Sequence, residues 1–143
     1  MKRTDILIYT LAALFIFSCA SKKEEAHGHP HEGSEQQGDW KEMDEFHMIM
    51  AETFHPYKDS ANLEPVKTRA VELMAAAEQW ASAGLPARVD NEEVKEKLKR
   101  LRSEAESLAE SVRTADENVI AEQLTRLHDT FHEIQETWYG GHH

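Results

Sequence analysis

Apolar residues recur in four segments of the chain with the alternating three- and four-residue spacing of amphipathic helices. Polar and charged residues fill the positions between them, as expected for helices with one buried face. The same alternation is typical of helices that pack side by side with a left-handed twist. The predicted apolar seams are Met43, His47, Met50, Phe54 and Tyr57 in the first helix, Leu63, Val66, Ala70, Leu73, Ala77 and Trp80 in the second, Val94, Leu98, Leu101, Ala105, Leu108 and Val112 in the third, and Ile120, Leu124, Leu127, Phe131, Ile134 and Trp138 in the fourth.

Capping residues and helix breakers set the bounds of these predicted helices. Three of the predicted N-caps are followed three residues later by a glutamate, the pattern of a capping box. Pro56 should end or kink the first helix, because proline lacks the amide hydrogen that a helix interior needs. Gly84 and Gly140 follow the second and fourth seams and fit helix ends. The predicted N-caps are Asp39, Asn62, Asp90 and Thr114.

The links between the predicted helices are short, which favours antiparallel neighbours. We therefore expect an all-α fold, an antiparallel up-down-up-down four-helix bundle over residues 39–139. The sequence contains no glycine-rich phosphate loop, no nucleophile elbow and no strand-like alternation of polar and apolar residues.

The N-terminus has the pattern of a secretory signal. A short positively charged region precedes an apolar run at residues 6–17, which is shorter than the roughly 20 residues that span a bilayer. The run ends in Ile16-Phe17-Ser18-Cys19, which resembles the lipobox of bacterial lipoproteins. The resemblance implies that residues 1–18 are a signal peptide and that Cys19 is acylated. The mature protein would then be held by lipid in the bacterial cell envelope, at the outer membrane, on its periplasmic face or at the cell surface.

Histidines also lie outside the predicted bundle. Residues 19–38 contain few apolar side chains and should form a flexible tether between the lipid and the bundle. Alternating imidazoles on such a chain bind Zn²⁺, Cu²⁺ or Ni²⁺ loosely, or act only as polar spacers. Residues 140–143 form a similar short tail. These secondary metal-binding candidates are His27, His29 and His31 in the tether and His142 and His143 in the tail.

Composition narrows the classes of function. The 143 residues carry a formal charge of −11, which makes binding to nucleic acid through a basic surface a poor fit. Cys19 is the only cysteine, so a lipidated chain has no disulfide, no thiolate ligand and no cysteine nucleophile. Nine histidines in so short a chain point instead towards metal binding.

Three histidines are expected to converge near one end of the bundle. His128 and His132 lie one helical turn apart, about 6 Å, which is a common spacing for two ligands of Zn or Cu. Antiparallel registration of the first and last helices sets His47 level with His132 and places Met50 or Ala51 level with His128. His47 also occupies a seam position, where a polar side chain needs a partner. His55 lies about 12 Å further along the helix and is interpreted as a separate, secondary candidate.

The segment Phe131-His132-Glu133, followed by Trp138 and Tyr139, resembles the last helix of the cytochrome b562 and cytochrome c′ group. That resemblance implies a secreted four-helix bundle with an iron ligand near the end of its last helix. The Cys-x-x-Cys-His motif of the c′ members is missing, so covalent haem is excluded. Non-covalent haem b would use His132 with Met43, Met50 or His47.

These features leave three functions open. The first is a non-enzymatic envelope lipoprotein that binds Cu, Zn or Ni through His47, His128 and His132, with Met50 as a fourth ligand, for metal buffering, delivery or sensing. The second is a b-type haem electron-transfer protein. The third is a cofactor-free structural or interaction bundle, with an envelope protein as its partner.

Overall fold

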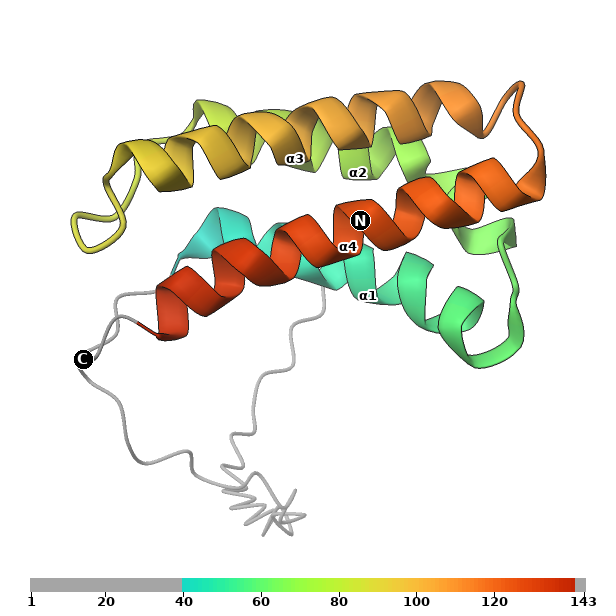
Figure 1. Ribbon diagram of the computed structural model, residues 1–143, viewed down its shortest axis with the longest axis horizontal. Helices are drawn as coiled ribbons and strands as arrows, with labels where there is room; N and C mark the ends of the chain where they lie inside the picture. Colours follow the sequence, from blue (N-terminus) through green and yellow to red (C-terminus); the bar gives the residue numbers. More distant parts are fainter. Residues whose placement is uncertain (1–39, 141–143) are drawn as a thin grey trace, which may run out of the picture. The chain divides into compact units, whose positions relative to one another are not determined.

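The computed structural model describes residues 40–140, which fold into four α-helices without a strand. The helices are α1 (Lys41–Ser60), α2 (Glu64–Ser82), α3 (Glu92–Ser111) and α4 (Glu117–Tyr139). The predicted all-helical fold with four packed helices is confirmed (Figure 1).

Each helix packs against its neighbour in the sequence, and α1 also packs against α4. Figure 1 shows α2 and α3 together in the upper half of the bundle and α1 and α4 together in the lower half. The α1/α4 pair is the least closely packed of the four neighbouring pairs. Within residues 40–140, no ion pair or side-chain hydrogen bond joins α1 to α4, whereas Arg102 and Glu78 link α3 to α2, and Arg100 and Glu133 link α3 to α4.

The predicted seams of α2 and α4 are buried in full, and that of α3 is buried except for the half-buried Val112. The prediction for α1 is wrong at one position. Phe46, not His47, points into the core between Met43 and Met50, and His47 is exposed. Burial of a phenylalanine side chain is worth about 1.5–3 kcal/mol, whereas a buried imidazole needs a polar partner. The helix is therefore rotated so that Phe46 is inside.

Aromatic rings fill one end of the core. The ring centroid of Trp40 lies 5.1 Å from that of Trp80 and 5.3 Å from that of Trp138. Arg88, in the connection between α2 and α3, places its guanidinium 4.1 Å from the centre of the Trp138 ring and donates a hydrogen bond to the Trp138 carbonyl. These contacts tie the α2–α3 connection and the residue before α1 to the end of α4.

The helix N-caps lie one or two residues away from their predicted positions. Asn91, rather than Asp90, accepts a hydrogen bond from the backbone N–H of Val94. Asp116, rather than Thr114, caps α4 and accepts from the backbone N–H groups of residues 118 and 119. An N-cap needs an extended backbone and a short polar side chain, and several neighbouring residues in each connection meet the second condition.

The first two helices begin without a side-chain cap. Trp40 occupies the N-cap position of α1 and Leu63 that of α2. Asn62, the predicted cap of α2, lies one residue before the N-cap position and accepts a hydrogen bond from the backbone N–H of Glu64. Asp39, the predicted cap of α1, lies outside the described residues.

Pro56 lies inside α1 and does not end it, so of the two predicted effects, an end or a kink, the first is wrong. The helix continues to Ser60, whose hydroxyl donates to the Pro56 carbonyl. Tyr57 packs against the core and lies 6.0 Å from Phe54, measured between ring centroids, so the last turn has a tertiary anchor. The helix then stops at Ala61, which adopts the left-handed conformation with φ of 55°. Among residues 40–140, no helix has both the length and the apolar character that crossing a membrane requires.

Candidate metal site

Two imidazoles meet on the surface of α4. His128 and His132 are one turn apart, and their Nε2 atoms are 3.0 Å from each other. Nitrogen ligands at 2.0–2.1 Å from one tetrahedral ion would be separated by about 3.3 Å. The two nitrogens therefore already have nearly the separation that a shared metal ion requires. In the metal-free pair, one ring donates and the other accepts a hydrogen bond, so the two rings must hold complementary tautomers.

His128 is held in place by an aromatic stack. Its ring lies 3.6 Å from the ring of Phe54 on α1, measured between centroids, with an interplanar angle of 11°. The side chain is 21% exposed, and Nδ1 lies 3.6 Å from the Asp129 carboxylate. Burial of the ring is the main cause that lowers the pKa of His128, and His132 adds to this effect, whereas Asp129 opposes it. The neutral imidazole, which is the form that binds metals, is therefore favoured.

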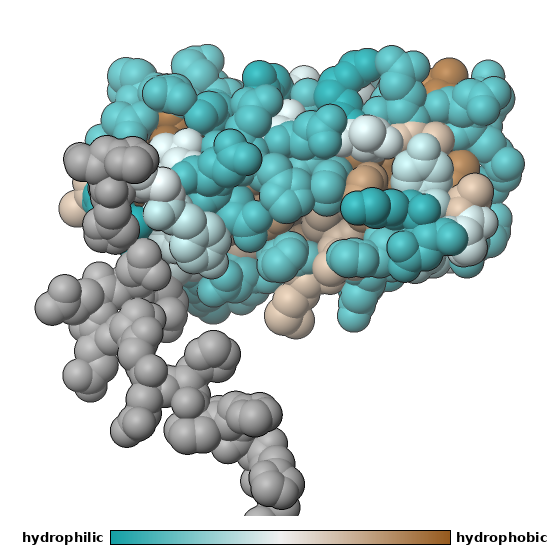
Figure 2. Space-filling model, turned by 60° about the horizontal axis from the view of Figure 1, so that its bottom comes forward, coloured by the Kyte–Doolittle hydropathy of each residue, from teal (hydrophilic) through white to brown (hydrophobic). Residues whose placement is uncertain are grey.

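His132 faces solvent at the edge of this stack. Its ring meets that of His128 nearly edge-on, with 4.4 Å between centroids and an interplanar angle of 72°. Figure 2 shows the side of the bundle that lies at the bottom of Figure 1. Most of its surface is hydrophilic, with smaller hydrophobic areas in the gaps between polar side chains. Because His132 is exposed, an ion from solution can reach the His128–His132 pair without passing through the core.

His47 does not join the pair. Its exposed ring stacks on Phe131, with 5.1 Å between centroids and an interplanar angle of 20°. Phe131 in turn lies 5.5 Å from His132, so its ring is a neighbour of both histidines. Across residues 40–140, the side chains of His, Cys, Asp and Glu form no group of three or more that could hold a metal ion.

The other predicted ligands are also apart from the pair or outside the described residues. Met50 is 1% exposed and belongs to the hydrophobic core. His55 is exposed on α1 and takes no part in the stack that holds His128. The remaining candidates, Cys19, His27, His29, His31, His142 and His143, lie outside the described residues.

No family model, no characterised protein and no solved structure matches this chain. Its function has to be inferred from its own residues.

The stacking partners of the histidines were not predicted from the sequence. Phe54 and Phe131 were predicted only as core residues, yet Phe54 orients His128 and Phe131 carries His47. A signal was present, because Phe54 lies seven residues after His47 and Phe131 lies between the two histidines of α4. These positions indicate the stacking partners only when the rotation of α1 about its own axis is known.

The interior around the methionines does not fit haem b. Met43 and Met50 are 2% and 1% exposed. Phe46 lies between these two methionines along α1, and its ring centroid is 5.6 Å from that of Trp80. A haem bound between a methionine of α1 and His132 would have to displace this packed ring, because close-packed interiors leave no room for a planar macrocycle.

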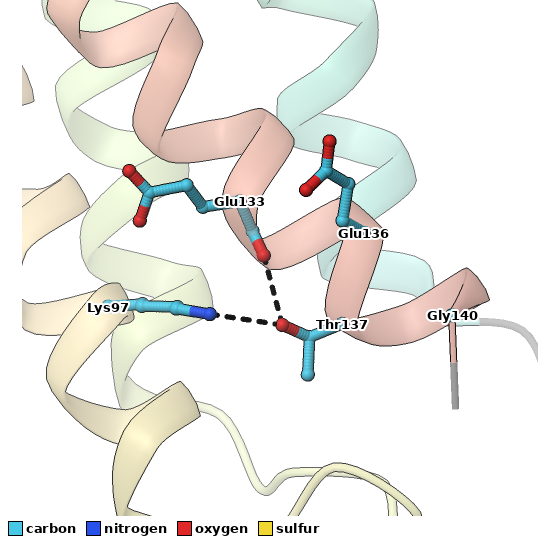
Figure 3. A pocket seen from close by; sticks show the side chains of 5 residues that line it. All are labelled: Lys97, Glu133, Glu136, Thr137 and Gly140. Atoms are coloured by element: carbon cyan, nitrogen blue, oxygen red, sulfur yellow. Dashed lines mark hydrogen bonds between the residues drawn. The ribbon is translucent and has the colours of Figure 1, made fainter. Parts of the chain in front are cut away.

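Apart from the histidine pair, a hollow with a volume of about 370 Å³ lies between α3 and α4. Figure 3 shows Lys97 of α3 reaching towards Thr137, while Glu136 points away from Lys97. Lys97 Nζ is 3.2 Å from the Thr137 hydroxyl and 2.7 Å from Glu93, and Glu133 pairs with Arg100. The charged groups on the Lys97 side are thus paired with each other, so this hollow is an ordinary surface network between two helices.

Proposed function

We propose that this chain is a lipid-anchored envelope protein whose four-helix bundle binds a transition metal ion, Cu, Zn or Ni, through His128 and His132. The observation that carries the proposal is the 3.0 Å separation of the two Nε2 atoms at an accessible surface. The stack of His128 on Phe54 supports it, because a ligand held in its binding rotamer loses less entropy when the metal arrives.

The proposed architecture is the antiparallel up-down-up-down bundle. Three ring contacts support an antiparallel α1/α4 pair, because the α4 partner moves towards the N-terminus as the α1 residue number rises. The pairs are Trp40 with Trp138, His47 with Phe131, and Phe54 with His128. The connections between successive helices are short, which favours the same arrangement for the other pairs.

His47 and Met50 take a smaller part in this proposal than the sequence predicted. His47 would have to leave its stack on Phe131 before it could bind the ion. Met50 would have to leave the core, at a cost similar to that of exposing any large apolar side chain, about 1.5–3 kcal/mol. We therefore assign the ion to the His128–His132 pair and leave the role of His47 to be tested by substitution.

The proposed physiological role is non-enzymatic: metal buffering, delivery or sensing at the membrane. Lipid at Cys19 would hold the protein at the envelope, and the histidines of the tether and tail would collect ions with low affinity. The net charge of −11 favours the approach of cations to the whole surface.

Metal titration of the full chain tests the proposal. The five tether and tail histidines are first replaced by serine so that only the bundle histidines remain: His27, His29, His31, His142 and His143. Binding of Zn²⁺ and Cu²⁺ is then measured by calorimetry, and we expect His128→Ala or His132→Ala to weaken it at least tenfold. His55→Ala is the matched control and should leave binding unchanged.

The proposal fails if the serine-substituted chain binds neither ion, or if His132→Ala binds as tightly as its parent. A visible spectrum recorded after addition of haemin tests the haem alternative. A Soret band that disappears in His132→Ala would support haem b in place of a bare metal ion.

A further inference from the structure

We infer that the metal ion joins two copies of this chain, each of which contributes His128 and His132 to a four-nitrogen site. The inference rests on the proposed function, because it concerns the ligands that complete the same metal site. The metals favoured are those that accept four imidazoles in a tetrahedral arrangement, Zn²⁺ or Cu⁺.

The pair supplies only half of a closed coordination shell. Structural zinc sites are almost always four-coordinate, and two ligands leave two positions to be filled. Within residues 40–140, no third histidine, cysteine, aspartate or glutamate lies close enough to complete a group with His128 and His132. The missing donors therefore lie outside residues 40–140 of this chain: in its remaining histidines, in water, or in another molecule.

A second copy is suited to the site by symmetry. Most homodimers are related by a two-fold axis, so each copy presents the same patch to the other. A metal ion on that axis receives its ligands in identical pairs, and two pairs of imidazoles make four ligands. The site is at the surface, with His132 exposed, so the ion can lie between two molecules without opening either core.

Charges beside the histidines are complementary under the same two-fold symmetry. Asp129 follows His128 on α4, and its exposed carboxylate contacts only His128 among the described residues. Lys58 on α1 lies close enough to His128 to act on it electrostatically and forms no ion pair within residues 40–140. The patch thus carries one cation, from α1, and one anion, from α4, beside His128. In the proposed dimer, the Lys58 of each copy would pair with the Asp129 of the other.

The net charge makes such a dimer depend on the metal. Two chains with a charge of −11 each repel one another, and no large apolar patch among the described residues overcomes this repulsion. The ion adds positive charge on the axis and two coordinate bonds to each copy. Association should therefore appear with the metal and disappear when a chelator removes it.

Sedimentation equilibrium of the full chain in density-matched detergent tests the inference. The chain carries the five serine substitutions described above and is measured with Zn²⁺ and with a chelator. We expect the protein mass of a single chain with the chelator, which is 16.4 kDa if all 143 residues are kept and less if the signal peptide is removed, and twice that mass with Zn²⁺. One zinc should bind for every two chains, and His128→Ala and His132→Ala should each abolish the mass increase.

A charge-swap series tests the orientation of the two copies. Lys58→Glu and Asp129→Lys should each weaken the zinc-dependent dimer several-fold, and the double variant should restore it. His55→Ala is again the control.

A monomer that binds one zinc per chain overturns the dimer but leaves the proposed metal function intact. No zinc binding at all overturns the proposed function itself. A dimer that persists with the chelator or in His132→Ala shows that some other surface joins the copies and also overturns the inference.

Discussion

The α2/α3 side of the bundle and the α1/α4 side are built from different side chains. Between α2 and α3 the buried residues are mainly aliphatic, with the indole of Trp80 at one end, and one ion pair, Arg102 with Glu78, crosses from one helix to the other. Between α1 and α4 the contacts are aromatic rings and imidazoles, the packing is looser, and no ion pair crosses within residues 40–140. We therefore expect the first side to contribute more to stability, while the second leaves imidazoles accessible to solvent.

The largest expected effect is a cavity on the α2/α3 side. Leu101 is fully buried on α3, so Leu101→Ala should lower the free energy of unfolding by about 3–5 kcal/mol. Chemical denaturation followed by circular dichroism measures the loss. Val71→Ala is the matched control, because Val71 is 62% exposed on α2 and its truncation should change the free energy by less than about 0.5 kcal/mol.

Phe54→Ala tests the α1/α4 side in the same way. Phe54 is 8% exposed and stacks on His128, so Phe54→Ala removes both core packing and the support of the imidazole. We expect a loss near the lower end of the range for buried phenylalanine, about 3 kcal/mol, because the loosely packed seam can relax around the gap. Phe54→Ala should also weaken zinc binding, which Leu101→Ala should not do. Equal effects of the two variants on zinc affinity would contradict the division into a stabilising side and a ligand-binding side.

Metal binding should stabilise the α1/α4 side of the bundle. An ion that binds only the folded chain adds about 2.7 kcal/mol at a free concentration one hundred times its Kd. Thermal unfolding with and without Zn²⁺ should therefore show a higher midpoint with the ion, and His132→Ala should remove the difference. Hydrogen exchange should locate the added protection in α1 and α4. Protection gained only in α2 and α3 would place the ion elsewhere.

The two sides also differ in how far the sequence could predict them. Leu98, Leu101 and Trp80 follow a regular apolar repeat, and all are buried as predicted. In α1, both Phe46 and His47 fit a three-four pattern with Met43 and Met50, and only the packing of the whole bundle selects Phe46. A single-residue choice of this kind depends on the rotation of the helix, which the local pattern does not determine.

The candidate site also divides into a part that the local sequence pattern predicts and a part that depends on the tertiary arrangement. The spacing of His128 and His132 alone indicates neighbouring rings on one face, and the structure brings their nitrogens to 3.0 Å. The stack of His128 on Phe54 joins residues 74 positions apart in the chain, so it follows only from the tertiary arrangement. The left-handed conformation of Ala61 likewise had no signal, because glycine or asparagine usually occupies such a position.

A smaller stabilisation is expected where α1 ends. Ala61 has φ of 55°, a conformation that costs a residue with a Cβ roughly 1–2 kcal/mol. Ala61→Gly removes this cost but gives the unfolded chain more freedom, so the net gain should be about 0.5–1 kcal/mol. Denaturation measures it, and Ala75→Gly, at an exposed position inside α2, should change the stability by a similar amount in the opposite direction. Equal losses in both variants would mean that Ala61 is not strained.

The smallest expected effect is a dependence of stability on pH that arises from His128. Its folded pKa lies below the ordinary histidine value of 6.5, mainly because the ring is buried, so the unfolded chain takes up a proton more readily. Unfolding is then favoured as pH falls through 6.5, and the midpoint in urea, measured with a chelator present, should be lower at pH 5.5 than at pH 7.5. The charged neighbours are His132, Asp129 and Lys58, of which only Asp129 favours the protonated ring. His128→Gln should reduce the pH dependence, whereas the exposed His55→Gln should preserve it. If His128→Gln keeps the full pH dependence of the urea midpoint, the protonation of another group causes it. The stack on Phe54 then does not set the proton affinity of the site.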